Sequence, residues 1–270
     1  MPKYPQAAVS IDRPLERRRA LRLNWLLTSG VILAVVIWCA WGTGFNIPKL
    51  LAGMPALHDL GGRMLPPDME VFTELGVPTI ETLQMALLGT TIPVFFSLPL
   101  ALLAAINTTP NQVLGAAIRV LLNTLRTIPE LLWAMLLVSA VGLGTFPGTI
   151  ALILHTTGGL GKFYYEAIEA VDPGIIEAME ATGAGRFQVA WFGVLPNCFP
   201  ILLSSTLTYW DYNNRAATIL GLVGAGGIGL AFTHAIQDFQ YPIAMTCIIV
   251  IVLILTVIDR ISAALRARVI

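Results

Sequence analysis

Six apolar stretches, each close to the length that crosses a bilayer, constrain this chain more than any other feature of its sequence. They occupy residues 25–45, 79–106, 119–142, 146–162, 197–221 and 240–263. A helix needs about 20 mainly apolar residues to span the hydrocarbon core of a membrane. Only 12% of all residues are charged, whereas soluble domains carry about 25%. We therefore predict an all-α integral membrane protein with about six transmembrane helices.

Two of these stretches are less regular than the others. The fourth, 146–162, is short and contains Gly158, Gly159 and Gly161, which predict a break in the helix. The first has the apolar character of a cleaved signal peptide, but a polar lead of 24 residues precedes it and no A-x-A-like site follows it. We therefore predict that the first stretch is retained as a helix.

Both ends of the chain are rich in basic residues, which accumulate on the cytoplasmic side of membrane proteins. The basic residues of the two ends are Lys3, Arg13, Arg17, Arg18, Arg19, Arg22, Arg260, Arg266 and Arg268. By contrast, residues 46–78 contain only two basic residues, and residues 222–239 contain none. We therefore predict that both termini are cytoplasmic together with 107–118 and 163–196, and that 46–78 and 222–239 are external.

No second domain is expected. The predicted organisation is a basic cytoplasmic tail at 1–24, a first helix with its external loop at 25–78, a helical core at 79–263 and a short cytoplasmic tail at 264–270. Within the second part, residues 46–78 are rich in proline and glycine and show little periodicity, which predicts a loop with at most a short interfacial helix.

The cytoplasmic segment 163–196 interrupts the apolar runs with a short helical pattern. Asp172 and Pro173 form a helix start, with Asp as the cap and Pro at the first position. Gly183, at a place that needs positive φ or close backbone approach, ends the helix together with Gly185. One face carries Ile175, Ile176, Met179 and Thr182. Such a helix has nothing of its own chain to pack on, which favours docking on another protein; a loop lying on the membrane is the simpler alternative.

The same segment resembles the EAA signature of ATP-binding-cassette (ABC) importer permeases. Glu177 and Ala178 are followed by Gly183 and then by Leu195-Pro196 at the spacing of that signature. Two positions depart from it, because Met179 replaces a small residue and Gly193 stands where a branched aliphatic is usual. The resemblance implies a coupling helix that docks in a cleft of the ATPase subunit. The residues implied in coupling are Glu177, Ala178, Met179, Gly183, Ala184, Leu195 and Pro196.

A second resemblance extends over about residues 79–263. The stretches 126–133 (RTIPELLW), 150–183 and 213–229 are similar to permeases of phosphonate, phosphite and hypophosphite importers. This resemblance implies a type I ABC importer (MetI-like) permease fold in the bacterial cytoplasmic (inner) membrane, acting as a homodimer. It also implies two cytoplasmic ATPase subunits that bind ATP and Mg, and an extracytoplasmic substrate-binding protein. Import of phosphate or methionine, and an ion-coupled secondary transporter, are the alternatives.

The sequence supports neither of two common nucleotide-binding motifs. GAGGIG, with Gly224, Gly226, Gly227 and Gly229, fits G-x-G-x-x-G but lies between two predicted spans, without the strand and the acidic residue that a dinucleotide site needs. We interpret it as a tightly packed external turn. No P-loop is present, since the single Gly-Lys pair is followed by Phe163. We therefore expect no enzyme activity, no cofactor and no nucleic-acid partner for this chain, with membrane lipid around it.

The histidines and cysteines do not form a recognisable site. His58, His155 and His234 lack metal-ligand spacing. Cys39, Cys198 and Cys247 lie in or beside apolar runs, which is typical of small buried residues. No metal site is predicted.

Two pairs of charged residues stand out within the predicted spans, where charge costs at least a few kcal/mol. Arg126 and Glu130 are four apart around Pro129, and Asp211 and Arg215 are four apart around two asparagines. Each pair can satisfy itself on one helical face. Alternatively, the side chains line a water-filled path, where the planar fork of arginine suits an oxyanion. The candidate path residues are Arg126, Glu130, Asp211, Asn214 and Arg215, with Asn213 beside them.

Overall fold

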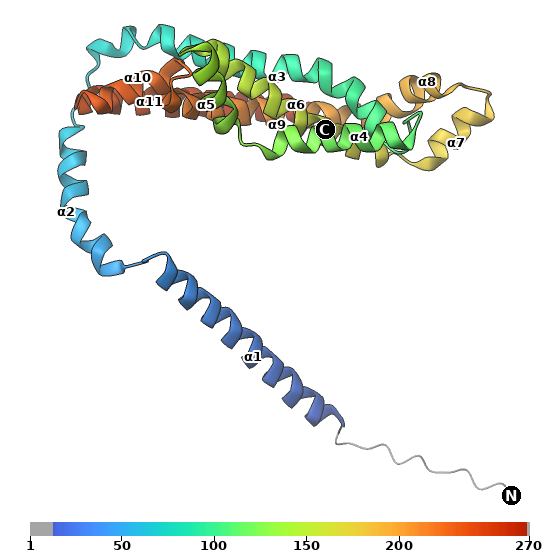
Figure 1. Cartoon of the computed structure of the whole chain (residues 1–270), viewed down its shortest axis with the longest axis horizontal. Helices are drawn as coiled ribbons and strands as arrows, with labels where there is room; N and C mark the ends of the chain where they lie inside the picture. Colours follow the sequence, from blue (N-terminus) through green and yellow to red (C-terminus); the bar gives the residue numbers. More distant parts are fainter. Residues whose placement is uncertain (1–12, 269–270) are drawn as a thin grey trace, which may run out of the picture. The chain divides into compact units, whose positions relative to one another are not determined.

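The computed structural model describes residues 13–268, and all regular structure within them is helical, as predicted (Figure 1). The predicted contribution of Lys3 to the basic tail, and the last two residues, lie outside this range. The chain divides into two compact units, Met1–Asp59 and Leu60–Ile270, which are described separately.

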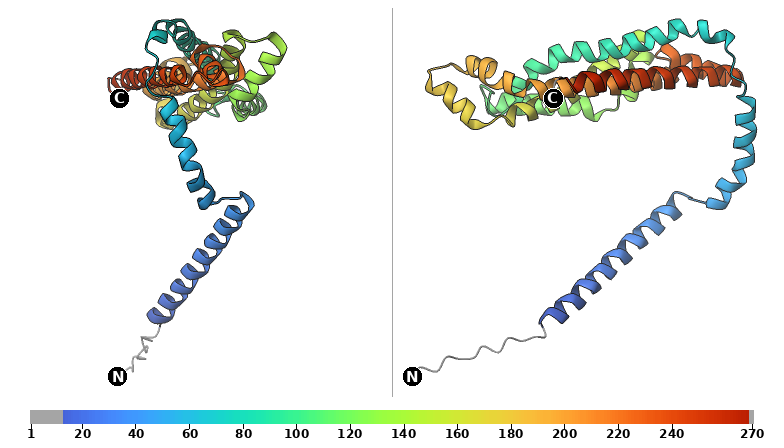
Figure 2. Two further views of the ribbon diagram at one scale, coloured as in Figure 1. Left: turned by 90° about the vertical axis from the view of Figure 1, so that its left-hand side faces the viewer. Right: turned by 180° about the vertical axis from the view of Figure 1, so that it is seen from behind.

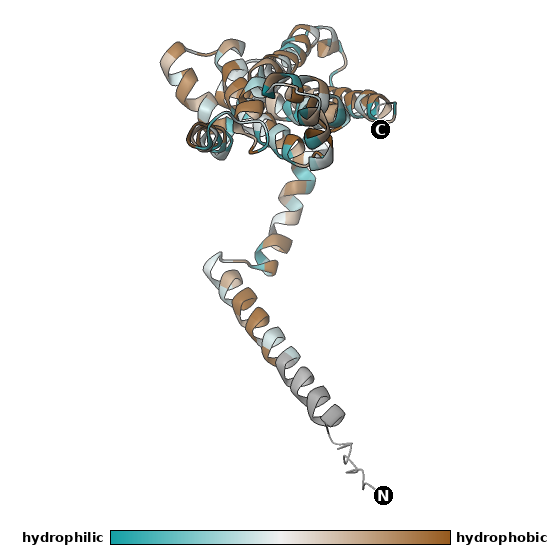
Figure 3. Ribbon diagram, turned by 90° about the vertical axis from the view of Figure 1, so that its right-hand side faces the viewer, coloured by the Kyte–Doolittle hydropathy of each residue, from teal (hydrophilic) through white to brown (hydrophobic). Residues whose placement is uncertain are grey.

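The first unit contains two helices, where the sequence predicted one helix followed by a loop. Helix α1 (Arg13–Gly42) is followed by α2 (Ile47–Arg63), whose last residues belong to the second unit, and the two are bent by 50° at the intervening turn. Gly44 occupies this turn with a φ of +64°, a conformation that favours glycine. The prediction of an irregular loop from residue 46 is therefore wrong over residues 47–63. Apolar residues dominate the described part of α1 (Figure 3).

The second unit is a helical bundle. Its long helices are α3 (Gly76–Ala104), α6 (Thr145–Glu169), α9 (Leu195–Leu220) and α11 (Tyr241–Arg266), which run side by side in both side views (Figures 1 and 2). Helix α6 packs against α3, α9, α4 (Gln112–Thr127) and α5 (Glu130–Val141). The core around α6 includes the fully buried Leu122, Leu160 and Ile168. Helix α6 is therefore the element on which the other helices are assembled.

The two ends of the bundle carry short elements. At one end, Glu70–Thr73 forms the 3-10 helix η1, and α10 (Gly227–Gln237) follows the 3-10 helix η3 (Gly221–Val223). At the other end lie α7 (Pro173–Ala181), α8 (Arg186–Gln188) and the π-helix η2 (Val189–Val194) (Figure 1). The predicted loop 222–239 is thus mostly helix, because Gly226 and Gly227, both at positive φ, turn the chain directly into α10.

Length and composition support between three and five membrane spans in the described residues. The helices α3 and α11 and the continuous stretch Arg186–Val223 qualify alone, and the bent pairs α1–α2 and α4–α5 qualify if each crosses as one span. The predicted fourth span, 146–162, corresponds to α6, whose 25 residues include glycines, threonines and a histidine that dilute its apolar character. The all-α membrane fold is confirmed, whereas the count of six is not confirmed.

Two expectations about helix continuity are wrong. Helix α6 continues without a break through Gly158, Gly159 and Gly161. The predicted third span, 119–142, is instead divided at Ile128-Pro129, where α4 and α5 meet at 82°. Ile128 is extended, with φ −78° and ψ 116°, because the proline ring disfavours helical geometry in the residue before it.

Candidate functional site

The short helix of the segment 163–196 begins and ends as its sequence predicts. The Asp172 carboxylate accepts a hydrogen bond from the Gly174 N–H at 2.9 Å, and Pro173 is the first residue of α7. Gly183 follows the helix with a φ of +82°, and a Cβ at this position would meet nothing within 4 Å. The requirement for glycine here is therefore conformational and does not come from crowding.

The apolar face of α7 packs on its own chain, contrary to the sequence expectation. Ile175, Ile176 and Met179 contact the core cluster that contains Val171, Val189 and Val194. Glu177 and Ala178 are exposed on the other side of the helix. Burial of the apolar face fixes α7 on the bundle, so the surface available to a partner is the polar side that carries the glutamate.

A shallow hollow and an aromatic pair lie beside this polar side. The hollow has a volume of about 410 Å³ and is lined by Met179, Thr182, Gly183, Ala184, Gln188 and Phe192. Phe187 and Trp191 stack with their ring centroids 6.0 Å apart and are both exposed. Aromatic side chains exposed next to a concavity are typical of a protein interface.

The two departures from the EAA signature contact each other. A Cβ at Gly193 would lie 3.1 Å from Cγ of Met179 and 3.8 Å from Cγ2 of Ile175. The larger residue at 179 therefore fills the space that a branched side chain at 193 would take. The two changes offset one another, and the packing between α7 and η2 is retained.

The link from this segment to α9 is a π turn. The N–H of Leu195 bonds to the carbonyl of Ala190, five residues back. Pro196 then contributes no N–H to the helix, while the Asn197 amide donates to the Gly193 carbonyl at 2.7 Å. Leu195 and Pro196 thus mark the place where the wide turn changes into the regular helix α9.

Further polar contacts, which the sequence did not predict, join the segment 163–196 to the preceding loop and to α4. Arg186 donates to the Pro110 carbonyl at 3.4 Å. Glu169, at the end of α6, accepts the Ile106 N–H at 2.8 Å and lies 3.9 Å from Arg119 of α4. The two loops at this end of the bundle are therefore held together by polar contacts.

The break between α4 and α5 gathers a polar cluster. Glu130, the first residue of α5, accepts a hydrogen bond of 2.8 Å from the Tyr212 hydroxyl of α9. Its other carboxylate oxygen lies 3.7 Å from Nε2 of His155 on α6. Arg126 has an exposed side chain that, within the described part of the chain, bonds only to Asn123, at 3.3 Å. The predicted self-pairing of Arg126 with Glu130 is therefore wrong, because the bend at Pro129 places them on different helices.

Side-chain donors replace the backbone bonds that the break removes. Nδ1 of His155 lies 3.1 Å from the Ile128 carbonyl, and the Trp133 indole N–H donates to the Leu125 carbonyl at 3.3 Å. Carbonyls left unpaired inside a membrane each cost several kcal/mol, so they require such partners. A proline within a span thus indicates that such partners are needed, but it does not identify His155 and Trp133 as the residues that provide them.

Asp211 and Arg215, the second pair predicted within a span, do not pair with each other either. Asp211 is buried, accepts a hydrogen bond from Ser262 and lies 3.2 Å from Arg266. Arg215 is exposed and contacts Asp259 at 2.8 Å. The predicted contact between residues 211 and 215 is therefore wrong, because each side chain pairs with a residue of α11 instead.

The two asparagines between them are buried. Asn213 donates to the Gly89 carbonyl at 3.0 Å and accepts from Thr156 at 3.0 Å, which joins α9 to α3 and α6. Asn214 donates to the Trp210 carbonyl at 2.7 Å, while its own oxygen has no hydrogen-bond partner among the described residues. Asn213 is structural, and Asn214 carries a free acceptor.

The glycine-rich turn 224–229 is built by close backbone packing. The carboxylate of Glu81 accepts the Gly227 N–H at 3.1 Å, and the Thr82 hydroxyl accepts the Ile228 N–H at 2.9 Å. A Cβ at Gly229 would collide with the Thr218 carbonyl, and one at Gly224 with Leu143. Side chains of α3 cap the start of α10, so the turn is not open to a phosphate.

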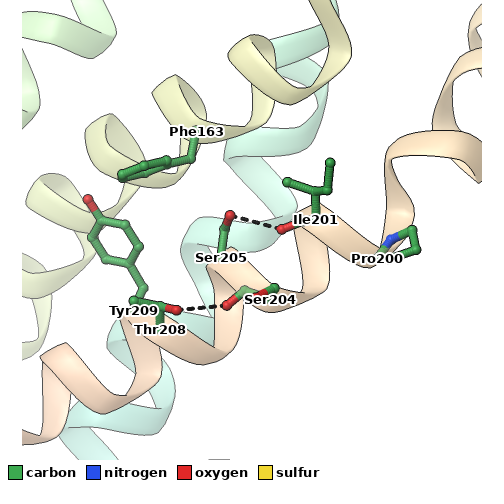
Figure 4. Close-up of a pocket in the computed structure, with 7 residues that line it drawn as sticks. All are labelled: Phe163, Pro200, Ile201, Ser204, Ser205, Thr208 and Tyr209. Atoms are coloured by element: carbon green, nitrogen blue, oxygen red, sulfur yellow. Dashed lines mark hydrogen bonds between the residues drawn. The ribbon is translucent and has the colours of Figure 1, made fainter. Parts of the chain in front are cut away.

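A groove lies between α6 and α9 (Figure 4). Its volume is about 290 Å³, and its lining residues are Phe163, Pro200, Ile201, Ser204, Ser205, Thr208 and Tyr209. One of its lining residues, Tyr209, has its ring 5.9 Å from that of Tyr212 in the polar cluster. Ser205 and Thr208 donate back to backbone carbonyls of their own helix. Within the described residues, no group of three or more histidine, cysteine, aspartate or glutamate side chains is arranged to hold a metal ion.

Residues 97–270 match the family described as "binding-protein-dependent transport system inner membrane component". The chain is 40% identical over 261 residues to the phosphite transport system permease protein PtxC of Stutzerimonas stutzeri, covering 94% of this chain and 95% of that protein. It is 39% identical over 227 residues to the phosphate-import permease protein PhnE of Mycolicibacterium smegmatis, covering 84% of this chain and 43% of that protein.

Solved structures show the same fold. A chain of the MetNI methionine ABC transporter, in an inward-facing conformation, superposes with a TM-score of 0.64 at 19% identity and covers 75% of this chain and 99% of that chain. The likeness confirms the predicted MetI-like permease fold. At this identity it carries no information about the substrate.

Proposed function

Because the chain belongs to the family of inner membrane components of binding-protein-dependent transport systems, we propose that it is the permease subunit of an ATP-driven importer for a small phosphorus oxyanion. The observation that carries the substrate class is the 40% identity to a phosphite permease over nearly the whole of both chains. Phosphonate and hypophosphite belong to the same class of anion. Phosphate is the second candidate, supported by the likeness to a phosphate-import permease.

The importer requires partners that this chain does not supply. We propose two cytoplasmic ABC ATPase subunits, which bind ATP and Mg, and an extracytoplasmic substrate-binding protein that delivers the anion. The absence of a P-loop from the sequence supports a separate ATPase. A homodimer of the permease completes the proposed complex, and a pair with a different permease is the alternative that purification of the complex distinguishes.

The polar side of α7 is the proposed ATPase contact. Glu177 and Ala178 are exposed there, and Gly183 ends the helix beside the hollow that Met179 and Ala184 help to line. Movement of the ATPase against α7 would reach α9 through the π turn and Leu195-Pro196, because these residues are continuous with α9. The packed apolar face of α7 makes the helix a firm attachment point.

Uptake by a reconstituted complex tests the function. Proteoliposomes that contain the permease and its ATPase, supplied with the binding protein and with ATP inside, should import radiolabelled phosphite or phosphate. Import should require both ATP and the binding protein. Import of methionine in place of either anion would show the same class of transporter with another substrate, whereas uptake driven by an ion gradient without ATP would contradict the proposal.

Two substitutions test the coupling surface. Glu177→Arg reverses an exposed charge, and Gly183→Val forces a β-branched residue into positive φ. Both variants should insert in the membrane and hydrolyse ATP without matching uptake. Wild-type uptake in both would remove the coupling assignment.

Labelling tests the proposed orientation, in which both termini and α7 are cytoplasmic. Single cysteines at the exposed positions Glu177 and His234 in a background without the native cysteines provide the two probes. A membrane-impermeant thiol reagent added to intact cells should label only position 234. Labelling at position 177 would contradict the proposed orientation.

A further inference from the structure

Both oxygens of the Glu130 carboxylate face side chains of other helices. One oxygen accepts a hydrogen bond of 2.8 Å from the Tyr212 hydroxyl of α9. The other oxygen lies 3.7 Å from Nε2 of His155 on α6. His155 is held in place because its Nδ1 atom lies 3.1 Å from the Ile128 carbonyl, which can only accept a hydrogen bond.

Arg126 has no carboxylate partner in this cluster. Glu130 is already engaged by His155 and by the Tyr212 hydroxyl. Among the described residues, Arg126 makes no ion pair, and its side chain donates to the neutral amide oxygen of Asn123. A guanidinium in a membrane span without a counter-ion is costly, and such groups face water or a functional path. The cluster therefore offers one positive charge, with free donors, to whatever lies beside it.

A polar face of α9 leads to this charge. Ser204, Ser205, Thr208, Tyr209 and Tyr212 follow one another at intervals of one and three residues, which places them on one side of the helix. The first four line the groove against Phe163 (Figure 4). The ring of Tyr209 lies 5.9 Å from that of Tyr212. The Tyr209 hydroxyl packs against Gly159, and the adjacent Gly158 packs against the backbone of Arg126.

A second cation that reaches the groove does not compete for this role. Arg266 reaches the Thr208 hydroxyl at 3.4 Å but lies 3.2 Å from the buried Asp211 carboxylate. Its charge is therefore offset, whereas that of Arg126 is not. The groove itself contains no charged side chain.

We propose that the break between α4 and α5 is an anion-binding station of the translocation path, in which Arg126 binds the phosphorus oxyanion as it passes along the hydroxyl-lined face of α9. His155 and Tyr212 are positioning residues, because they occupy the Glu130 carboxylate and so keep it from neutralising Arg126. The proposal rests on the proposed function and names the residues that contact its substrate.

The first test separates anion passage from assembly. In the reconstituted complex, Arg126→Gln should lower the maximal rate of phosphite uptake about tenfold or more, since a charge-assisted bond is lost. The concentration for half-maximal uptake, which the binding protein sets, should not change. ATP hydrolysis should continue, so the ATP used per anion imported should rise by the same factor. Arg126→Lys keeps the charge without the planar fork and should fall between wild type and Arg126→Gln.

The matched control removes an arginine elsewhere. Arg260→Gln neutralises an exposed arginine of α11 that lies outside the cluster, and it should leave the ATP used per anion unchanged. Equal losses of uptake and hydrolysis in Arg126→Gln, with the ratio unchanged, would assign Arg126 a structural role and overturn the proposal. If the wild-type complex imports neither phosphite nor phosphate, the proposed function fails, and that outcome is visible before any variant is compared.

A second measurement needs no transport. Ser205→Cys, in a background without the native cysteines, places a thiol in the groove of the purified complex. An anionic methanethiosulfonate reagent should modify this thiol faster than a cationic one, and Arg126→Gln should abolish the preference. Phosphite should slow the anionic reagent. An unreactive thiol, or equal rates for both reagents, would show that the groove is not an anion path.

Discussion

Helix α6 and the α4–α5 pair lie against each other and both contain residues that disrupt helices, yet only one of them is broken. Helix α6 passes through Gly158, Gly159 and Gly161 as a continuous helix of 25 residues. The neighbouring pair bends by 82° at Pro129. A glycine weakens a helix by about 1 kcal/mol, which close packing can offset, whereas a proline removes a backbone donor and restricts the residue before it.

The two features depend on each other. A Cβ at Gly158 would lie 2.5 Å from the backbone nitrogen of Arg126, in the last turn of α4 before the break. One turn earlier on α6, His155 bonds to the carbonyl of Ile128. The straight helix therefore supplies both the space and the hydrogen-bond donor that the bent pair needs. Continuity in one helix is a condition for the break in its neighbour.

The largest effect should come from filling the space at Gly158. Gly158→Ala brings a methyl group against the backbone of α4, which cannot rotate away as a side chain can. Overpacking of this kind lowers the free energy of unfolding by up to about 3 kcal/mol. We expect little folded permease after detergent extraction and a lower midpoint of thermal unfolding. A variant that melts with the wild type would mean that α4 is not held against α6.

Replacing the proline should have a smaller effect. Pro129→Ala restores a backbone N–H, but the bend is also held by His155 and Trp133, so we expect it to persist at a cost of about 1 kcal/mol. Spin labels at the exposed positions Leu114 and Leu136 measure the separation of α4 and α5. A lengthened distance in the variant would show that the proline alone makes the break.

Removing one of the donors at the break should cost about the same or less. Trp133→Phe keeps most of the apolar ring and loses the hydrogen bond to the Leu125 carbonyl, which is worth about 1 kcal/mol. We expect a modest fall in the midpoint of thermal unfolding and normal assembly. Combining it with Pro129→Ala should give more than the sum of the single effects if both support one bend.

The smallest effect should have the opposite sign. Gly53 lies within α2, and a Cβ there would meet nothing within 4 Å. Gly53→Ala should therefore stabilise the helix by no more than about 1 kcal/mol. Hydrogen exchange of the α2 amides measures this local change. Loss of protection in the variant would show that this glycine, like those of α6, is required by packing.

The features that the sequence predicted correctly depend on local chemistry. Asp172 and Pro173 begin α7, and Gly183 ends it, because each acts on the backbone within one turn. The long apolar stretches likewise predicted the all-α membrane fold. Helix α2 and the glycines of α6 were misread, because composition alone does not show what packs against a residue.

The errors at the charged residues have a different cause. A spacing of four residues shows that two side chains can meet, but it does not show which other partners compete for them. Asp211 and Arg215 each find a partner on α11, in Arg266 and Asp259. These partners lie more than 40 residues further along the chain. Identification of His155 required the position of the break, which only the folded chain provides.

The π turn at Val189–Val194 has a consequence for how the chain can change in length. A π turn holds one residue more than the α turn that replaces it, as the bond from Leu195 to Ala190 shows. Deleting one residue within this turn would convert it to an ordinary α turn without rotating the helices on either side. A one-residue deletion there should therefore be tolerated in folding, whereas the same deletion in α6 would displace every glycine from its neighbour.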